Sequence, residues 1–427
     1  MLQRLNSLVA KARNSNEKPF LLEFLRFGSS TGFLQLTRVA SGLVVAALVD
    51  PAVWGTWYIL NLIIAYGGLT QLGALNGMNR EVPVASGKGD HALARQLRSN
   101  ALGVVLLTTG VAALLILGSS FAIPNLELSD ELLLTILLLL ATQLFAYASN
   151  SLRSTTNFTQ LSRLQLVQAV VYPALSIGGA VALGLPGFIL GQILALGVCI
   201  VATRRSATVT WRPELNLKII KGLIGVGFPI MLVGLIYTLL STVDRWIVAG
   251  NLGSESLGHY SLAIMALNAV ALLPQVISQQ FYPRLAFSWS AKRDVSELRN
   301  MATRQRLYTY IAVIPTVALI ALLAPPIVNA FLPQYAPGIP AILVTALVPL
   351  VSTLGQGYGG ILHVLNRQYW YIGAMLVAVL VNVVASLALV GPFGLVGVAM
   401  GTFIAFIVLA VARVALGSLA LKRAVNS

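Results

Sequence analysis

The stretch that decides the fold is Gly227–Leu262, GFPIMLVGLIYTLLSTVDRWIVAGNLGSESLGHYSL, in which two adjacent charged residues, Asp244 and Arg245, lie inside an apolar run. A charged side chain in a membrane segment costs about 2.5–3.5 kcal/mol on the insertion scale, so it tends to face a partner or a water-filled cavity. The stretch therefore predicts a membrane-spanning segment with a polar interior face.

The composition extends this prediction to the whole chain. Hydrophobic residues make up 57% of the 427 residues, charged residues only 10%, and the mean hydropathy is +0.84. Water-soluble chains of this length do not approach such a balance. The single cysteine, Cys199, and three well separated histidines predict neither disulfides nor a metal site, and no cofactor is expected. The predicted class is an all-α polytopic membrane protein.

Apolar runs of roughly 20 residues, the length that crosses a bilayer, occur twelve times. They lie near residues 21–49, 52–76, 99–123, 131–152, 163–184, 186–203, 222–250, 258–283, 305–332, 338–365, 368–390 and 393–420. Very short turns, at Asp50-Pro51 and near Leu185-Pro186-Gly187, separate two of the pairs. We expect two six-helix bundles, residues 1–205 and 206–427, joined by a cytoplasmic segment at 204–221.

The formal net charge of +15 is explained by membrane topology. Lys and Arg accumulate in cytoplasmic loops, and here they occupy loops on one side only, from Arg80 to Arg367, and the C-terminus. The opposite loops hold acidic residues such as Glu127 and Glu255, and no Lys or Arg. Both termini are therefore predicted to be cytoplasmic, and no nucleic-acid partner is expected.

Polar side chains recur at steps of three and four residues in four predicted spans, so each set shares one helix face. These stripes are Thr31, Gln35, Arg38 and Ser41; Tyr237, Ser241 and Asp244; Asn268, Gln275, Gln279 and Tyr282; and Thr353, Gln356, Gly360 and His363. They indicate either a hydrophilic cavity or hydrogen bonds that hold helices together, worth about 0.6 kcal/mol each.

Candidate substrate-binding residues follow from these stripes. They are Arg38, Gln35, Arg245, Asn268, Gln275, Gln279 and Gln356. Arg38 leads, because no acidic residue lies at helical spacing beside it and a guanidinium cannot become neutral, so a partner helix or an anionic ligand must satisfy it. Asp244 is a candidate either for coupling to H⁺ or Na⁺ or for a structural latch between the bundles.

Three further arginines lie near the predicted cytoplasmic boundary. Arg80 and Arg284 follow the second span of each half, and Arg26 lies three residues after Glu23. They are candidate contacts for a lipid headgroup, although topological anchoring and a surface ion pair also account for them.

Four segments together carry a resemblance to a known family. They are FGSSTGFLQLTRVASGLVVAALVDPAVWGTW (27–57), NREVPVASGKGD (79–90), NFTQLSRLQLVQAVV (157–171), and the opening stretch extended to Ala263. In this order and spacing they resemble the polysaccharide transporter family of the MOP exporter superfamily, the O-antigen or Wzx-type lipid-linked oligosaccharide flippases.

The resemblance implies a MOP/MATE-like fold and a multi-pass protein of the bacterial inner membrane that is not an enzyme. Its implied function is to move undecaprenyl-pyrophosphate-linked oligosaccharide, as in lipopolysaccharide, capsule or exopolysaccharide assembly, to the periplasmic leaflet by alternating access. An H⁺ or Na⁺ gradient or the membrane potential would drive it. The implied partners are this substrate, membrane lipids and glycan-assembly proteins such as a polymerase.

The alternative is a MATE-type multidrug or cation antiporter, which shares the superfamily fold. Such proteins resemble this chain but usually carry an acidic residue in the first bundle, where this chain has Arg38. Lipid II flippases commonly have two further spans, and a glycan-processing enzyme would need larger outer loops than the few residues predicted here.

Overall fold

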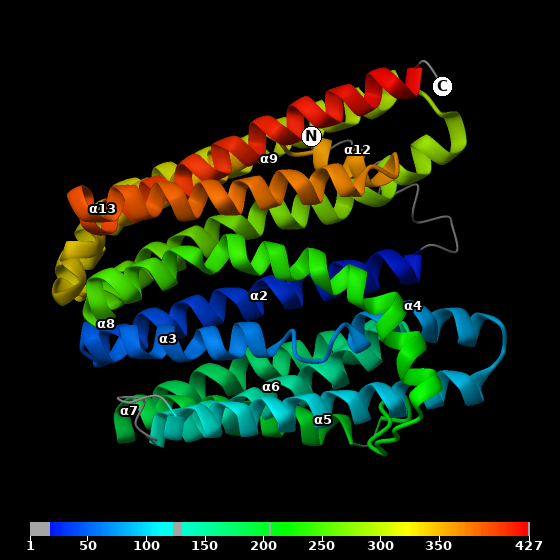
Figure 1. Cartoon of the computed structure of the whole chain (residues 1–427), viewed down its shortest axis with the longest axis horizontal. Coiled ribbons are helices and arrows are strands. Elements are labelled where there is room, and N and C mark those ends of the chain that lie inside the picture. The colour runs from blue at the N-terminus through cyan, green and yellow to red at the C-terminus, as the bar shows by residue number, and fades with distance from the viewer. Residues whose placement is uncertain (1–17, 123–129, 205, 426–427) are drawn as a thin grey trace. The chain divides into compact units, whose positions relative to one another are not determined.

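The computed structural model describes residues 18–122, 130–204 and 206–425, and within them the chain is almost entirely helical (Figure 1). The helices before residue 204 are α2 (Lys18–Leu48), α3 (Pro51–Gly67), α4 (Ala74–Gly87), α5 (His91–Ala122), α6 (Asp130–Ser154) and α7 (Phe158–Thr203). Those after it are α8 (Leu217–Lys292), α9 (Val295–Phe331), η1 (Pro333–Gly338), α10 (Ile339–Ala346), α11 (Val348–Leu354), α12 (Tyr358–Val364) and α13 (Gln368–Val425). The predicted all-α class is confirmed.

Eight stretches of the described residues are long and apolar enough to cross a membrane. Three of the helices that contain them, α7, α8 and α13, are broken by a glycine with non-helical dihedral angles: Gly184, Gly253 and Gly394. All three glycines have positive φ, which other residues adopt only at a cost. Figure 1 shows α8 and α13 each folding back on itself. Each of these helices therefore consists of two arms.

The predicted breaks agree with the structure at some places and not at others. The first pair separates as predicted, with Pro51 at the first position of α3. The predicted span 52–76 matches α3 but is too long, because α3 ends at Gly67 and a turn precedes α4. The predicted span 338–365 is instead a series of short helices, since prolines lack a backbone N–H and Gly357 has a φ of 86°. Apolar periodicity does not register such interruptions.

The helices form two compact units. Unit 1 comprises the described residues within 1–41, 70–182 and 186–230, and unit 2 those within 42–69, 183–185 and 231–427. The division predicted from the sequence, 1–205 and 206–427, stays a prediction. In unit 1, residues between α7 and α8 pack on the helices: the Tyr147 hydroxyl donates to the Thr210 carbonyl (2.5 Å), and Asn100 Oδ1 accepts from the Asn216 N–H (2.6 Å).

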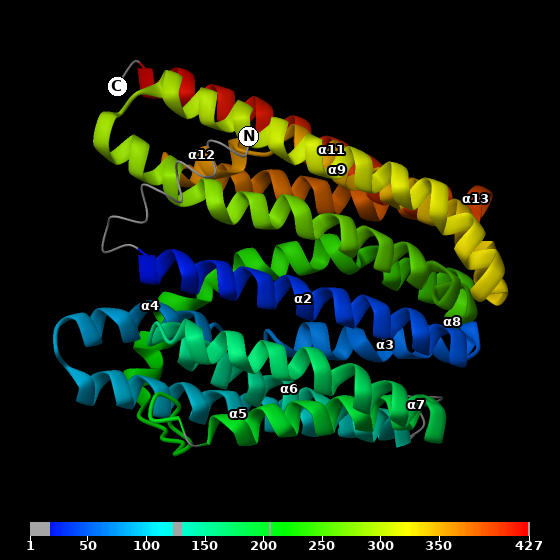
Figure 2. The ribbon, with the colours of Figure 1, turned by 180° about the vertical axis from the view of Figure 1, so that it is seen from behind.

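Unit 2 holds the end of α2, the helix α3, α8 from residue 231 onward, the helices α9 to α13, and a polar network that ties α8 to α13. Asn382 donates to the Leu240 carbonyl (3.3 Å), while its Oδ1 accepts from Ser386 (3.0 Å) and Thr402 (3.4 Å). All three polar side chains are buried, so this network fixes both arms of α13 against α8. Figure 2 shows α9 running along α13.

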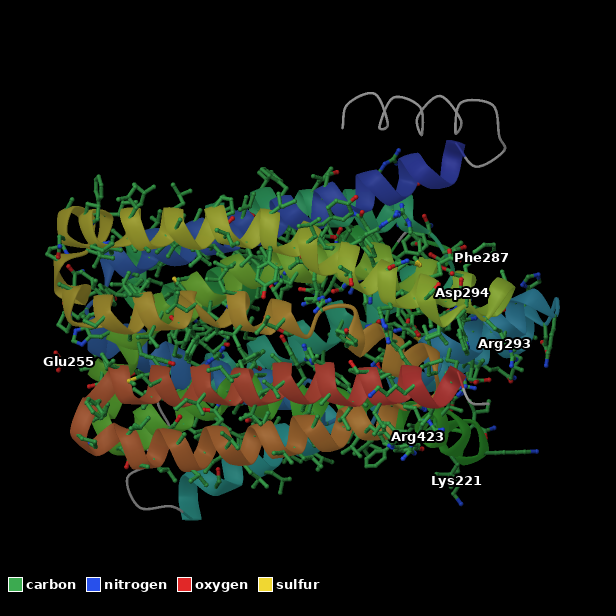
Figure 3. The ribbon with its side chains drawn as sticks, turned by 90° about the horizontal axis from the view of Figure 1, so that it is seen from above. Lys221, Glu255, Phe287, Arg293, Asp294 and Arg423 are labelled. Carbon is green, nitrogen blue, oxygen red and sulfur yellow. The ribbon has the colours of Figure 1, made fainter. Side chains whose placement is uncertain are left out.

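Several charged side chains of unit 2 lie near the ends of its helices. In Figure 3, Glu255 lies at one end, and Arg293, Asp294 and Arg423 lie at the opposite end. The predicted separation of acidic and basic loops stays a prediction, because Asp294 lies at the same end as the two arginines. The assignment of the basic end to the cytoplasm stays a prediction.

Candidate functional site

Unit 2 contains an open cavity of about 610 Å³. Its wall is built from both arms of α8, from α9, α11 and α12, and from both arms of α13. The polar and aromatic lining residues are Tyr237, Ser241, Asp244, Arg245, Asn268, Gln275, Ser278, Gln279, Tyr282, Gln305, Ser352, Gln356, His363, Tyr371, Thr402, Phe406 and Arg413. A volume of this size is within the usual range of ligand-binding clefts.

Three of the four polar stripes meet at this cavity. Every residue of the two stripes on α8 lines the cavity. Gln356, Gly360 and His363 of the third stripe line it as well. Thr353 does not, because it is fully buried and donates to the Pro349 carbonyl (2.7 Å). The structure thus brings together six of the predicted site residues: Asp244, Arg245, Asn268, Gln275, Gln279 and Gln356.

Asp244 and Arg245, the charged pair in Gly227–Leu262, both line the cavity, but they differ in their hydrogen bonds. Asp244 is 4% exposed; its Oδ1 accepts from the Arg245 backbone N–H (2.9 Å), and its Oδ2 accepts from the Tyr260 hydroxyl (3.1 Å). Tyr260 lies beyond Gly253, so Asp244 joins the two arms of α8. The Arg245 Nε is buried and has no hydrogen-bond partner. The carboxylate is therefore satisfied by the protein, and the guanidinium nitrogen Nε is not.

Sequence reasoning missed a second arginine in the cavity, Arg413 of α13. Its Nη2 donates to the Tyr371 hydroxyl (2.6 Å), and its guanidinium carbon lies 4.9 Å from the centre of the same ring. A Cβ on Gly355 would collide with the Arg413 side chain, so the glycine makes room for it. The missed signal was available, because Arg413 lies within an apolar run, as Arg38 does.

Aromatic rings extend the wall away from Arg413. The His363 ring packs edge-on against Tyr371, with centroids 5.4 Å apart, and against Tyr282, at 6.4 Å. Tyr282 is 47% exposed and Tyr237, on the first α8 arm, is 52% exposed. The cavity therefore offers ring surfaces to a ligand as well as polar atoms.

A small hydrogen-bonded cluster fixes the amide of Gln356. Gln356 Oε1 accepts from the Ser278 hydroxyl (2.8 Å), and the buried Gln305 amide donates to Ser278 (3.0 Å) and to Gln356 (3.3 Å). Because two helices, α8 and α9, and the turn between α11 and α12 contribute, the cluster holds this part of the wall in place.

The cavity has a positive charge balance. Its lining includes two arginines and one aspartate. Among the described residues the ion pair that forms is Arg80 with Glu81, so neither cavity arginine has a carboxylate partner. The same residues include no group of histidine, cysteine and acidic side chains that could hold a metal. The chemistry that this wall favours is the binding of an anion together with hydroxyl groups.

Arg38 and Gln35, the first-span candidates, lie on α2 in unit 1. The Arg38 guanidinium carbon lies 5.5 Å from the centre of the Tyr172 ring on α7. Its Nε is buried without a hydrogen-bond partner. Gln35 is half-buried. The cation that the sequence singles out thus rests on an aromatic ring and keeps an unused donor.

The boundary arginines are not part of the cavity lining. The Arg80 side chain is 65% exposed and lies 3.9 Å from Glu81, and Arg284 is exposed on α8. The side chains of Arg26 and Glu23 lie outside the part of the structure that is described. The headgroup role of these arginines stays a prediction.

The family comparison agrees with this architecture. Residues 93–336, more than half of the chain, match a family described as polysaccharide biosynthesis protein. The chain belongs to this family. The polysaccharide family predicted from the sequence is thereby confirmed. No curated protein sequence matches the chain.

Solved structures show the same fold at low sequence identity. An inward-facing multidrug resistance MATE family transporter of the MOP superfamily is similar, with a TM-score of 0.75, 15% identity, and coverage of 92% of this chain and 96% of that one. A MOP superfamily transporter from Pyrococcus furiosus, whose binding pocket is described as reversed in polarity, has a TM-score of 0.63 at 13% identity over 95% and 96%. A Vibrio cholerae MATE transporter has a TM-score of 0.63 at 16% identity over 95% and 96%. This polysaccharide biosynthesis protein therefore has a MOP-type transporter fold.

Proposed function

We propose that the protein is a flippase that moves undecaprenyl-pyrophosphate-linked oligosaccharide from the cytoplasmic to the periplasmic leaflet of a bacterial inner membrane. The observation that carries the proposal is the positively charged cavity, with rings and amides, in a MOP-type member of a polysaccharide biosynthesis family. Arginine suits phosphate and carboxylate oxygens, and amides suit sugar hydroxyls. No metal or cofactor takes part in this proposal.

The proposed topology has twelve spans with both termini in the cytoplasm. Separating α7, α8 and α13 at their glycine breaks gives two arms each, and these arms correspond to the paired apolar runs of the sequence. The concentration of Lys and Arg in alternate loops supports the orientation. Alternating access is the proposed mode of transport.

Arg38 is the proposed contact for the pyrophosphate. Its contact with Tyr172 leaves the guanidinium positively charged, and its Nε is unused. A planar guanidinium can give two parallel hydrogen bonds to phosphate oxygens. Arg38 would thus bind the phosphate oxygens through a guanidinium that the Tyr172 ring holds in place.

A MATE-type cation antiporter is the second candidate, and the similarity to multidrug transporters supports it. A cationic drug needs an available carboxylate. In the cavity of unit 2 the carboxylate is Asp244, which is buried and accepts two hydrogen bonds, while two arginines face the same space. This charge balance favours an anionic substrate over a cationic one.

Complementation tests the proposed function in cells. The gene would be expressed in a set of bacterial strains, each lacking one defined lipid-linked glycan flippase. We expect surface glycan to return in at least one strain. Resistance to cationic dyes, with no glycan restored in any strain, would favour the antiporter.

A further inference from the structure

We propose that the cavity of unit 2 binds an oxyanion carried on the sugars of the substrate, a carboxylate or phosphate ester, and so selects acidic glycans over neutral ones. This inference rests on the proposed function, because it names the kind of glycan that the transporter carries. Arg413, held by Tyr371, is the central residue of this subsite.

The charged side chains that line the cavity do not balance one another. Arg245 and Arg413 line the cavity, and neither forms an ion pair within the described residues. Asp244 supplies at most one negative charge against these two arginines, and its oxygens accept hydrogen bonds from Tyr260 and the Arg245 backbone. A guanidinium keeps its charge at physiological pH. An anionic ligand would supply the negative charge that balances the second arginine.

The Arg413 guanidinium is held in place by the protein itself. The Tyr371 hydroxyl accepts from one terminal nitrogen, and the ring lies beside the guanidinium. The Nε of Arg413 is buried and has no hydrogen-bond partner, and the same holds for Arg245. A guanidinium that is oriented by one partner and keeps free donors loses little entropy when it binds an oxyanion.

The cavity is also lined by uncharged side chains that suit the neutral parts of a sugar. Tyr237 and Tyr282 expose about half of their surface, and Gln275 and Gln279, which also line the cavity, are exposed. Rings can pack against sugar carbons, and amides can bond hydroxyls. A pyrophosphate alone does not need such a surface. The combination fits a sugar that carries a charge.

The test compares two substrates that differ in one group. Both have the same polyprenyl pyrophosphate and the same trisaccharide, except that one hexose is replaced by the corresponding hexuronic acid. Since the pyrophosphate is common to both, a difference in their transport reports the charge on the glycan. In proteoliposomes we expect the wild type to move the acidic substrate about tenfold faster, the effect of one well-placed charged contact.

The variants locate this preference. Arg413→Gln should remove it, and Tyr371→Phe, which keeps the ring and loses the hydrogen bond, should reduce it. Arg423→Gln is the matched control, because Arg423 lies on the same helix but is not part of the cavity lining. A wild type without preference, or an Arg413→Gln protein that retains it, would overturn the inference.

A second measurement separates this inference from the proposed function. If neither lipid is moved, the flippase assignment fails, and binding of the two soluble trisaccharides to the purified protein then decides the inference. Tighter binding of the acidic trisaccharide to the wild type, lost in Arg413→Gln, supports the subsite. Equal binding of the acidic and neutral trisaccharides overturns it.

Discussion

An arginine inside an apolar helix keeps its charge, so it needs an acceptor, a ring or an anion beside it. Arg38 and Arg413 meet this need in similar ways, with Tyr172 and Tyr371 respectively, and each keeps a buried Nε without a hydrogen-bond partner. A buried donor without a hydrogen-bond partner is costly in a residue that has only a structural role. It is expected of residues whose remaining donors serve a ligand.

Replacing Arg38 by alanine should abolish translocation and leave membrane insertion intact, because the change removes a cation and leaves the Tyr172 ring in place. Transport of lipid-linked glycan and the amount of inserted protein would be measured together. Arg299→Ala, at an exposed residue of α9, is the control and should transport normally. Normal transport by well-inserted Arg38→Ala protein would refute the role of Arg38.

Asp244→Asn should have a milder effect. Asparagine keeps one acceptor oxygen, so one of the bonds from Tyr260 and the Arg245 backbone can persist in place of two. We expect a loss of roughly 1 kcal/mol in stability, the usual worth of one hydrogen bond, and partial transport. Thermal unfolding in detergent and the transport rate measure the two effects. Full activity would exclude an obligatory coupling carboxylate.

The sequence predicted part of the site at this scale. Steps of three and four residues correctly grouped Tyr237, Ser241 and Asp244, and also Asn268, Gln275, Gln279 and Tyr282, because both sets lie on regular helix. Arg413 was missed even though it is an isolated charge in an apolar run. Its proximity to Arg245 could not have been predicted, since it depends on the packing of α13 against α8.

At the scale of elements, helix breaks shape the cavity. The sequence predicts most spans, since an apolar run of sufficient length becomes a helix in a membrane. It does not predict the interruption between α11 and α12, where Gly355, Gln356 and Gly357 form a bend that turns the Gln356 amide into the cavity. The bend depends on local dihedral angles, which leave no trace in hydropathy.

Gly357→Ala tests the bend. The φ of Gly357 is 86°, and an added Cβ would meet the backbone of Ala302 on α9. A residue other than glycine in this sparsely populated backbone region costs about 1–3 kcal/mol, so the variant should unfold at a lower temperature than the wild type. Gly359→Ala is the matched control, because its Cβ would only touch the Tyr371 ring at 4.0 Å. Equal unfolding temperatures for the two variants would contradict this account of the bend.

At the scale of the whole molecule, the proposed function is a transport of negative charge out of the cell. Moving one elementary charge through 100 mV changes the free energy by about 2.3 kcal/mol. An inside-negative potential should therefore accelerate outward movement of the substrate. Imposing a potassium diffusion potential on proteoliposomes and recording the transport rate tests this, and a rate independent of the potential would show that no net negative charge moves in the rate-limiting step.

The central claim is that this member of the polysaccharide biosynthesis family translocates a polyprenyl-pyrophosphate-linked glycan. The most direct measurement reconstitutes the purified protein in liposomes with such a lipid and follows the exposure of its glycan on the opposite leaflet. We predict translocation that depends on the wild-type protein. Expulsion of cationic dyes from the same liposomes, with the lipid-linked glycan left on its original side, would contradict the account.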